Sequence, residues 1–402
     1  MGNSFRKITT SRSSYPILLN LLLFGIVAAI PGVLSGLLLI DIGNSLNVSV
    51  ALTGQLNTLS SIIAIIFALL TSILSVKYNH KTLLQIGLLM YIFSAIGCYL
   101  SPSFNIMIAS FSLTGIGFAL TTTMAFTLTA ELFSLEKRGE AIGWIFAGMS
   151  ISYILGAFAV PHLQNIGGWR ASFLDYLLPS SVLTLILATV IIPKGSNGFT
   201  NDSQVNLGVG FKNILSNRSA LFALFGNLLA MATWQGILTY NVSFFRESFL
   251  ISLSEASIFI MVGSVLYTIG SVLCGRAVNR LGRKPLAAFS ILVAGVVFLG
   301  YSYLPSFMVS AGVVCVGWFL LGVRDTAATS LIIEQLPLYA GIMMALNRAV
   351  TQIGFTLGSG LGGIFLMIYD YKIMFLMLGL LAVCSAAIFH WLTIDPSADK
   401  IV

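Results

Sequence analysis

The stretch GRAVNRLGRKP, residues 275–285, places four Arg or Lys side chains within eleven positions of a chain that is otherwise poor in charge. Only 8% of the 402 residues are charged and 57% are hydrophobic, whereas soluble globular proteins usually carry about 25% charged residues. Long apolar segments flank the stretch on both sides. This composition predicts a multi-span membrane protein in which the basic cluster marks a short loop between two spans.

Twelve apolar segments are long enough to cross a bilayer as helices, which takes about 20 residues each. Continuous runs rich in Leu, Ile, Ala and Gly favour helices over β-strands, because a helix satisfies its own backbone hydrogen bonds in lipid. We therefore predict an all-α membrane protein with twelve transmembrane helices. The predicted spans are 17–40, 50–75, 82–101, 105–130, 140–161, 172–193, 220–243, 254–275, 285–304, 307–333, 341–367 and 373–393.

The basic residues predict the orientation of these spans. With the N-terminus in the cytoplasm, fifteen Lys and Arg residues fall on the cytoplasmic side and three fall outside, as the positive-inside rule requires. Both termini are therefore predicted to be cytoplasmic, in a protein of the plasma membrane. Residues 194–219 are polar and rich in Gly, Ser and Asn, which predicts a cytoplasmic linker between two six-helix bundles, 1–193 and 220–402.

The basic stretch has a weaker copy, SILSVKYNHK, at residues 72–81, which lies 203 residues earlier. Glu131 in ELFSLEKRGEAIG precedes Glu334 in EQLPLYAGIMMAL by the same offset, and GWRASF at 168–173 precedes DYKIMF by 202 residues. Six predicted spans separate equivalent points, so the two halves have the same orientation. This spacing predicts two pseudo-symmetric bundles built as a parallel repeat.

The same motifs carry a family resemblance that covers nearly the whole chain. GRAVNRLGRK resembles the loop motif G-x-x-x-[DN]-R-x-G-R-[RK] of the major facilitator superfamily, ELFSLEKRGEAIG resembles its signature after span four, and GWRASF resembles its start of span six. The resemblance looks closest to the twelve-span drug and small-solute efflux branch. It implies a secondary active transporter of a small organic solute that works by alternating access, is proton-coupled and exports its substrate.

In this superfamily the basic loop helps to hold the outward-facing state, so the resemblance implies a cytoplasmic gate. The alternative is that the cluster only fixes topology. Gly275 and Gly282 would permit a tight connection and close backbone approach, and His80 is predicted to be a solvated loop histidine. The predicted gate residues are Gly275, Asn279, Arg280, Gly282, Arg283, Lys284, Glu131, Arg138 and Glu334.

Three ionisable residues, Arg324, Asp325 and Arg348, lie within predicted spans, where charges are costly and usually functional. In the first interpretation Asp325 pairs with Arg348 or Arg324 and only neutralises a buried charge. In the second, at least one arginine faces a central cavity and binds an anionic group such as a carboxylate, with Gln352 one turn from Arg348. Asp325 is the candidate proton carrier.

The resemblance also implies which spans line the substrate cavity, namely one, four, seven and ten. For each polar residue on these spans, ordinary hydrogen bonding between helices is the alternative to substrate contact. The candidate wall residues are Asn20, Thr122, Asn227, Trp234, Gln235 and Tyr240, with Tyr267 of span eight added.

Other function classes find little support. The three histidines are scattered and form no HExxH pair, and no GxxxxGK[ST] loop occurs, which argues against an enzyme or an ATP-driven pump. The net charge of +7 follows from topology and needs no nucleic acid. We expect a monomer with a small-molecule substrate, protons or another coupling ion and the bilayer as partners, and neither cofactor nor metal. The alternatives are an organic-anion transporter using Arg324 and Arg348 and a non-transporting sensor on a transporter scaffold.

Overall fold

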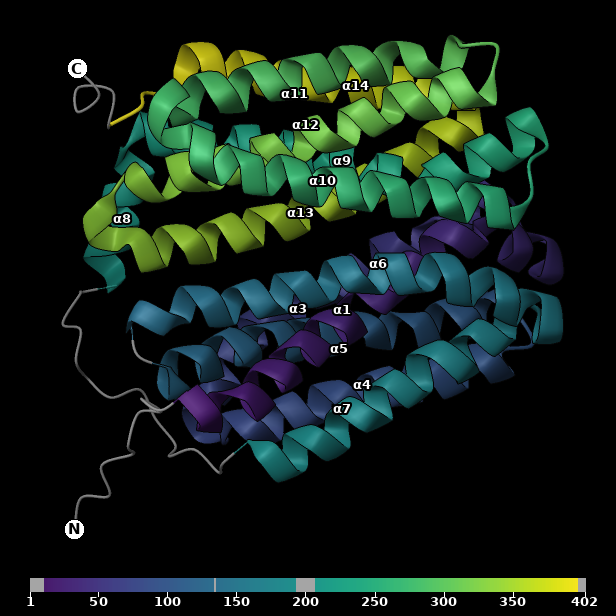
Figure 1. Cartoon of the computed structure of the whole chain (residues 1–402), viewed down its shortest axis with the longest axis horizontal. Helices are drawn as coiled ribbons and strands as arrows, with labels where there is room; N and C mark the ends of the chain where they lie inside the picture. Colours follow the sequence, from purple (N-terminus) through teal and green to yellow (C-terminus); the bar gives the residue numbers. More distant parts are fainter. Residues whose placement is uncertain (1–10, 134, 193–206, 397–402) are drawn as a thin grey trace. The chain divides into compact units, whose positions relative to one another are not determined.

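The computed structural model of the chain describes residues 11–133, 135–192 and 207–396 (Figure 1). Within these ranges every regular element is a helix, which confirms the predicted all-α fold. The elements of the first half are α1 (Ser11–Leu46), α2 (Val50–Thr53), α3 (Gln55–Lys77), α4 (His80–Leu100), α5 (Phe104–Leu132), α6 (Leu135–Ser172), the π-helical turn η1 (Phe173–Leu177) and α7 (Leu178–Ile191). Those that follow are α8 (Leu207–Ser216), α9 (Arg218–Phe249), α10 (Leu253–Leu281), α11 (Arg283–Gly300), η2 (Tyr301–Tyr303), α12 (Phe307–Glu334), η3 (Pro337–Tyr339), α13 (Ala340–Ile368), α14 (Tyr371–Ala387) and η4 (Ile388–Leu392).

Eleven helical stretches in the described part of the chain are long and apolar enough to cross a membrane. One of them, Glu140–Ile191, has 52 residues, which is more than twice the length that a single span needs. Its backbone leaves the helical conformation at Gly167 and at Gly168, where φ is +70°, a value that glycine adopts without strain. This stretch therefore holds both predicted spans 140–161 and 172–193, and each of the twelve predicted spans has a helical counterpart.

The chain forms two compact units, one of Met1–Val48 with Leu59–Thr200 and one of Ser49–Thr58 with Asn201–Val402. In the first unit α1 packs on α6, and α4 packs on α5 and α7. In the second, α9 packs on α13, while α11 packs on both α12 and α14. The predicted bundle boundaries stay a prediction, since residues 193–206 lie outside the described residues. The linker predicted over 194–219 also stays a prediction, and its described part forms the short helix α8.

The predicted internal repeat is confirmed by the helix boundaries. Helices α2, α4 and α5 begin at residues 50, 80 and 104, and helices α10, α11 and α12 begin at residues 253, 283 and 307. Each helix of the second set thus starts 203 residues after its counterpart, which is the offset read from the sequence. The two halves therefore build their spans from the same template.

Glycines of α6 and α13 let each helix approach its main neighbour closely. A Cβ atom built on Gly148 would lie 2.0 Å from the Leu22 carbonyl oxygen of α1, and one built on Gly358 would lie 2.1 Å from the Ala232 carbonyl oxygen of α9. Real Cβ atoms do not come this close to other atoms. The two backbones could therefore not pack at this distance if position 148 or 358 held any residue other than glycine. Tight packing within each unit thus accounts for these two glycines.

We expect Gly148→Ala to lower the free energy of unfolding by roughly 2 kcal/mol, because the added methyl group meets backbone that cannot move without shifting α1. Gly143 lies on the same helix, is exposed and has no atom within 4 Å of an added Cβ, so Gly143→Ala is the matched control. That control should raise stability by about 0.5–1 kcal/mol through helix propensity. Melting curves of the two detergent-purified variants test this, and equal shifts would contradict it.

Candidate functional site

The centre of the candidate site is an ion pair between neighbouring residues of α12. The side chain of Arg324 is 0% exposed, and its Nη1 donates a hydrogen bond to Asp325 Oδ1 over 2.7 Å. The side chain of Asp325 keeps 22% of its surface exposed. A guanidinium in a low-dielectric interior is stable only with a counter-charge, so Asp325 supplies the compensation that Arg324 needs.

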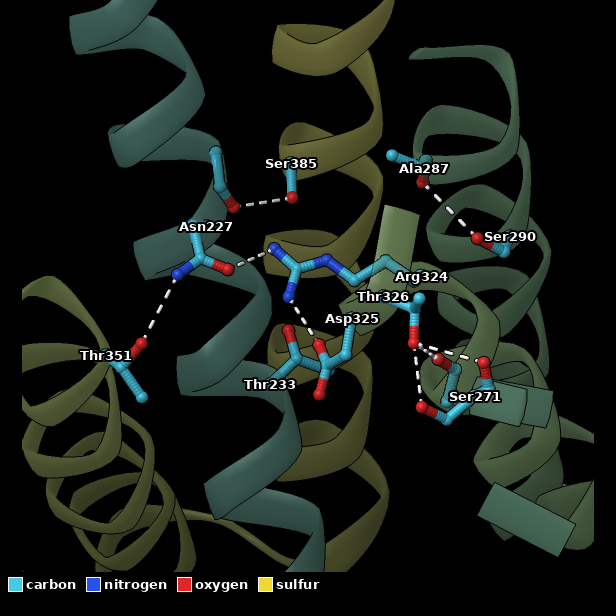
Figure 2. A network of polar contacts seen from close by, with 12 residues as sticks. Asn227, Thr233, Ser271, Ala287, Ser290, Arg324, Asp325, Thr326, Thr351 and Ser385 are labelled. Carbon is cyan, nitrogen blue, oxygen red and sulfur yellow. Dashed lines mark hydrogen bonds and ion pairs between the residues drawn. The ribbon is translucent and has the colours of Figure 1, made fainter. Parts of the chain in front are cut away.

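Two further helices hold Arg324 in place (Figure 2). Its Nη2 donates to Asn227 Oδ1 of α9 over 2.6 Å, and Asn227 Nδ2 donates in turn to Asn347 Oδ1 of α13 over 2.7 Å. Thr351, one turn along α13, accepts a longer bond of 3.3 Å from Asn227. We call Arg324, Asp325, Asn227, Asn347 and Thr351 the charge network. It links α9, α12 and α13, so a change in charge at Asp325 is felt by all three helices.

An aromatic cluster adjoins the charge network. The Tyr267 hydroxyl of α10 donates to Asp325 Oδ2 over 2.5 Å, so both carboxylate oxygens have partners. The Tyr267 ring stacks on Trp234 of α9 with centroids 5.2 Å apart, and Trp234 meets Trp318 of α12 edge to face at 5.1 Å. Trp318 is buried, and its indole Nε1 has no hydrogen-bond partner among the described residues. Three helices thus present planar rings beside a partly exposed carboxylate.

The structure separates the two arginines that the sequence treated as equivalents. Asp325 pairs with Arg324, as one branch of the first interpretation predicted. Arg348 is exposed on α13, and it is the adjacent Asn347 that joins the charge network. Gln352 is half-buried one turn beyond. Sequence reasoning missed Asn347, although Asn347 and Thr351 stand four residues apart and thus share one helix face.

Three other candidate wall residues have local or no hydrogen bonds. The Thr122 hydroxyl donates to the Phe118 carbonyl of its own helix over 2.5 Å, and Gln235 donates to Thr239 within α9 over 3.3 Å. Asn20 on α1 is buried, and neither of its amide atoms has a hydrogen-bond partner among the described residues. The assignment of these residues to a substrate site stays a prediction.

The predicted gate loop joins α10 to α11 directly. Gly282 has φ +83°, so it supplies the left-handed backbone that the predicted tight connection needs. The predicted close approach at Gly275 is wrong, since nothing lies within 4 Å of a Cβ added there. Arg280 is exposed in the last turn of α10, and the Lys284 amide donates to Asp395 Oδ2 over 3.4 Å. The side chain of Asn279 lies outside the described part of the structure.

Both repeat-related glutamates have basic partners within their own units. Glu334 Oε1 lies 3.6 Å from Arg283 Nη2, and Glu131 Oε1 lies 2.7 Å from His80 Nδ1. The prediction that His80 is solvated is wrong, because His80 is only 4% exposed. It is the first residue of α4, not a loop residue, since Asn79 caps the helix just before it. Arg138, the remaining predicted gate residue, donates from Nε to the Phe133 carbonyl over 3.3 Å.

Two repeats of six spans each are an architecture typical of membrane transporters. The Major Facilitator Superfamily profile matches residues 17–244 and 223–401, so the chain belongs to that superfamily. It is accordingly a multi-pass integral membrane protein and a secondary transporter of small solutes, not an enzyme. Among the described residues, no group of three or more His, Cys, Asp or Glu side chains is arranged to hold a metal ion.

The relatives share the fold at low sequence identity. The chain is 20% identical over 335 residues to the uncharacterized MFS-type transporter YbcL of Bacillus subtilis, covering 83% of this chain and 84% of that one. It is 22% identical over 301 residues to multidrug resistance protein 2 of the same species, covering 72% and 73%. A bacterial homologue of the human lysosomal transporter Spinster, solved inward-facing and unoccupied, aligns with a TM-score of 0.78, 15% identity and 95% and 97% coverage. A D-xylose–proton symporter aligns with a TM-score of 0.78, 16% identity and 95% and 98% coverage.

Proposed function

We propose that this transporter exchanges protons for a small organic substrate, with Asp325 as the proton carrier, and that it exports the substrate. The observation that carries the proposal is the unequal exposure of the ion pair. Arg324 is sealed at 0% exposure, while Asp325 keeps 22% of its surface open and holds Arg324 through one oxygen only. The carboxylate is therefore the member of the pair that a proton or a substrate can reach.

Protonation of Asp325 would change the charge of the network from neutral to +1. Arginine does not lose its proton in proteins, and an uncompensated charge in the interior costs several kcal/mol. Proton binding is therefore favourable only together with a rearrangement around Arg324. The hydrogen bonds from Arg324 to Asn227 and from Asn227 to Asn347 transmit that rearrangement to α9 and α13. This is the link between protonation and helix movement that coupled transport requires.

The neighbours of Asp325 suit a planar, apolar and cationic substrate. Trp234 and Tyr267 form a stacked pair next to the carboxylate, and aromatic faces attract cations. A cation and a proton would compete for the same carboxylate, which produces exchange of one for the other. The name of one relative, multidrug resistance protein 2, supports drug-like compounds as the substrate class. The alternative, transport of an organic anion, now depends on Arg348, which is exposed on α13.

Proteoliposomes with an acidic lumen test the coupling. We expect the wild-type protein to accumulate ethidium, a planar lipophilic cation, inside these vesicles as protons leave. The variant Arg324→Met/Asp325→Asn removes both charges together. It should still equilibrate ethidium across the membrane, but it should lose the accumulation that the pH gradient drives, because no proton carrier remains. Asp175→Asn is the control, since Asp175 is an exposed acid of η1.

Two results would overturn parts of this proposal. Gradient-driven accumulation of ethidium by the double variant at the wild-type level would remove Asp325 from the coupling. Accumulation of benzoate in place of ethidium, lost in Arg348→Gln, would favour the organic-anion alternative.

A further inference from the structure

The two units carry equivalent ion pairs that differ in one chemical respect. His80 pairs with Glu131 in the first unit, and Arg283 pairs with Glu334 in the second. Residues 80 and 283 both open a helix, and residues 131 and 334 both lie at the end of the helix packed against it. Each basic residue and each acid is separated from its counterpart by 203 positions. The pairs are thus the same structural device, built with imidazole in one unit and guanidinium in the other.

The chemical difference lies in titration. Arginine stays charged at every physiological pH, whereas imidazole changes its charge between about pH 5 and 8. The histidine pair is also the shorter one, with 2.7 Å between Nδ1 and Oε1 against 3.6 Å between Nη2 and Oε1 in the arginine pair. It is more deeply placed, since His80 is 4% exposed and Arg283 is 19% exposed. A charge change at His80 is therefore poorly screened by water.

The helices that pack around this pair differ in the ionisable residues that they carry. Glu131 is the only ionisable residue of α5, and α7 contains none. On α4 itself, Lys81 is next in sequence, and its Nζ donates to the carbonyl oxygens of Thr189 and Ile192. Lys77 ends α3 three residues earlier, and α6 opens with the charged segment LEKRGE, residues 135–140. Among the side chains that the structure describes, Glu131 is the group that lies within hydrogen-bond distance of the His80 ring.

We propose that the His80–Glu131 pair is a pH-sensitive brace between α4 and α5, and that Arg283–Glu334 is its permanently charged counterpart. When His80 is protonated, the contact is a charge-assisted hydrogen bond, which is about twice as strong as a neutral one. When the ring loses its proton, the ion pair ends and at most a hydrogen bond from neutral imidazole remains. The brace is therefore strongest at the acidic end of the range and weakens as pH rises towards 8. Of these two pairs, only the one in the first unit therefore changes with pH in this range.

Thermal unfolding of the purified full-length protein as a function of pH tests the brace independently of transport. The wild-type melting temperature should fall by about 2–4 °C between pH 6 and pH 8 relative to that of His80→Arg, which makes the first pair permanent like the second. His80→Gln removes the titrating group without adding a charge. Its melting temperature should be lower than that of His80→Arg but should depend on pH in the same way. His162→Gln is the matched control, because His162 is exposed and should keep the wild-type profile.

Glu131→Gln supplies a second criterion. This variant leaves His80 in place but removes the carboxylate. Its melting temperature should therefore stay constant or rise between pH 6 and pH 8. Parallel pH profiles for wild type, His80→Arg and Glu131→Gln would overturn the proposal. Because the readout is stability, such a failure would leave the proton exchange at Asp325 standing, and a failure of proton exchange would leave the brace standing.

Discussion

Asp325→Asn is expected to lower the free energy of unfolding by about 3–5 kcal/mol, because it leaves the guanidinium of Arg324 buried without a counter-charge. Arg324→Met should cost less. Asp325 is partly exposed, so water can solvate its carboxylate once its partner is gone. Removing both charges in Arg324→Met/Asp325→Asn should restore most of the stability, since a neutral pair needs no compensation.

Melting curves and monodispersity of the three variants in one detergent measure this order. Thr326 provides a matched control on the next position of α12, because its hydroxyl bonds Ser271 of α10 outside the charge network. Thr326→Val should cost only about 1 kcal/mol. Equal losses for the two single charge variants, or a double variant less stable than either, would show that Asp325 does not compensate Arg324.

Trp234→Ala is expected to weaken binding of ethidium by about 30-fold. The loss of one aromatic face from a desolvated cation site is worth about 2 kcal/mol, and 1.4 kcal/mol corresponds to a factor of ten. Trp234 stacks on Tyr267 and meets Trp318, so its removal opens the aromatic cluster beside Asp325. Trp234→Phe keeps an apolar ring and should recover much of the affinity.

Equilibrium binding of ethidium to the purified protein, followed by its fluorescence, measures this change. Trp391→Ala is the control, because Trp391 is a large aromatic residue that is exposed in η4. Wild-type affinity in Trp234→Ala would exclude the aromatic cluster as the substrate surface, whatever the role of Asp325.

The charge network and the aromatic cluster lie in the second unit, and the repeat allows the equivalent positions of the first unit to be compared. Thr121 of α5 stands where Arg324 stands in α12, and its hydroxyl donates to the Gly117 carbonyl of its own helix. Ile145 stands where Arg348 stands, is buried, and its carbonyl oxygen faces Gly25 of α1. At these positions the first unit has uncharged side chains and the second has arginines, so the charge network departs from the repeat.

Much of this protein is determined by the sequence alone. Apolar segments of span length predict helices because lipid leaves no other way to satisfy the backbone, and the offset of 203 residues reappears in the starts of α10, α11 and α12. Hydropathy and residue spacing are properties of the linear sequence, so they predict these features without knowledge of which helices are in contact. The positions of Arg324, Asp325 and Asn227 within membrane-spanning helices could be predicted in the same way.

The tertiary structure decided how the polar side chains pair. Two arginines at similar depth looked interchangeable, yet the rotation of each helix buries Arg324 against Asn227 and leaves Arg348 exposed. His80 looked solvated because it follows a loop, yet the packing of α4 on α5 buries it against Glu131. A side chain's partner depends on which helix face meets which neighbour, and local sequence does not encode that choice.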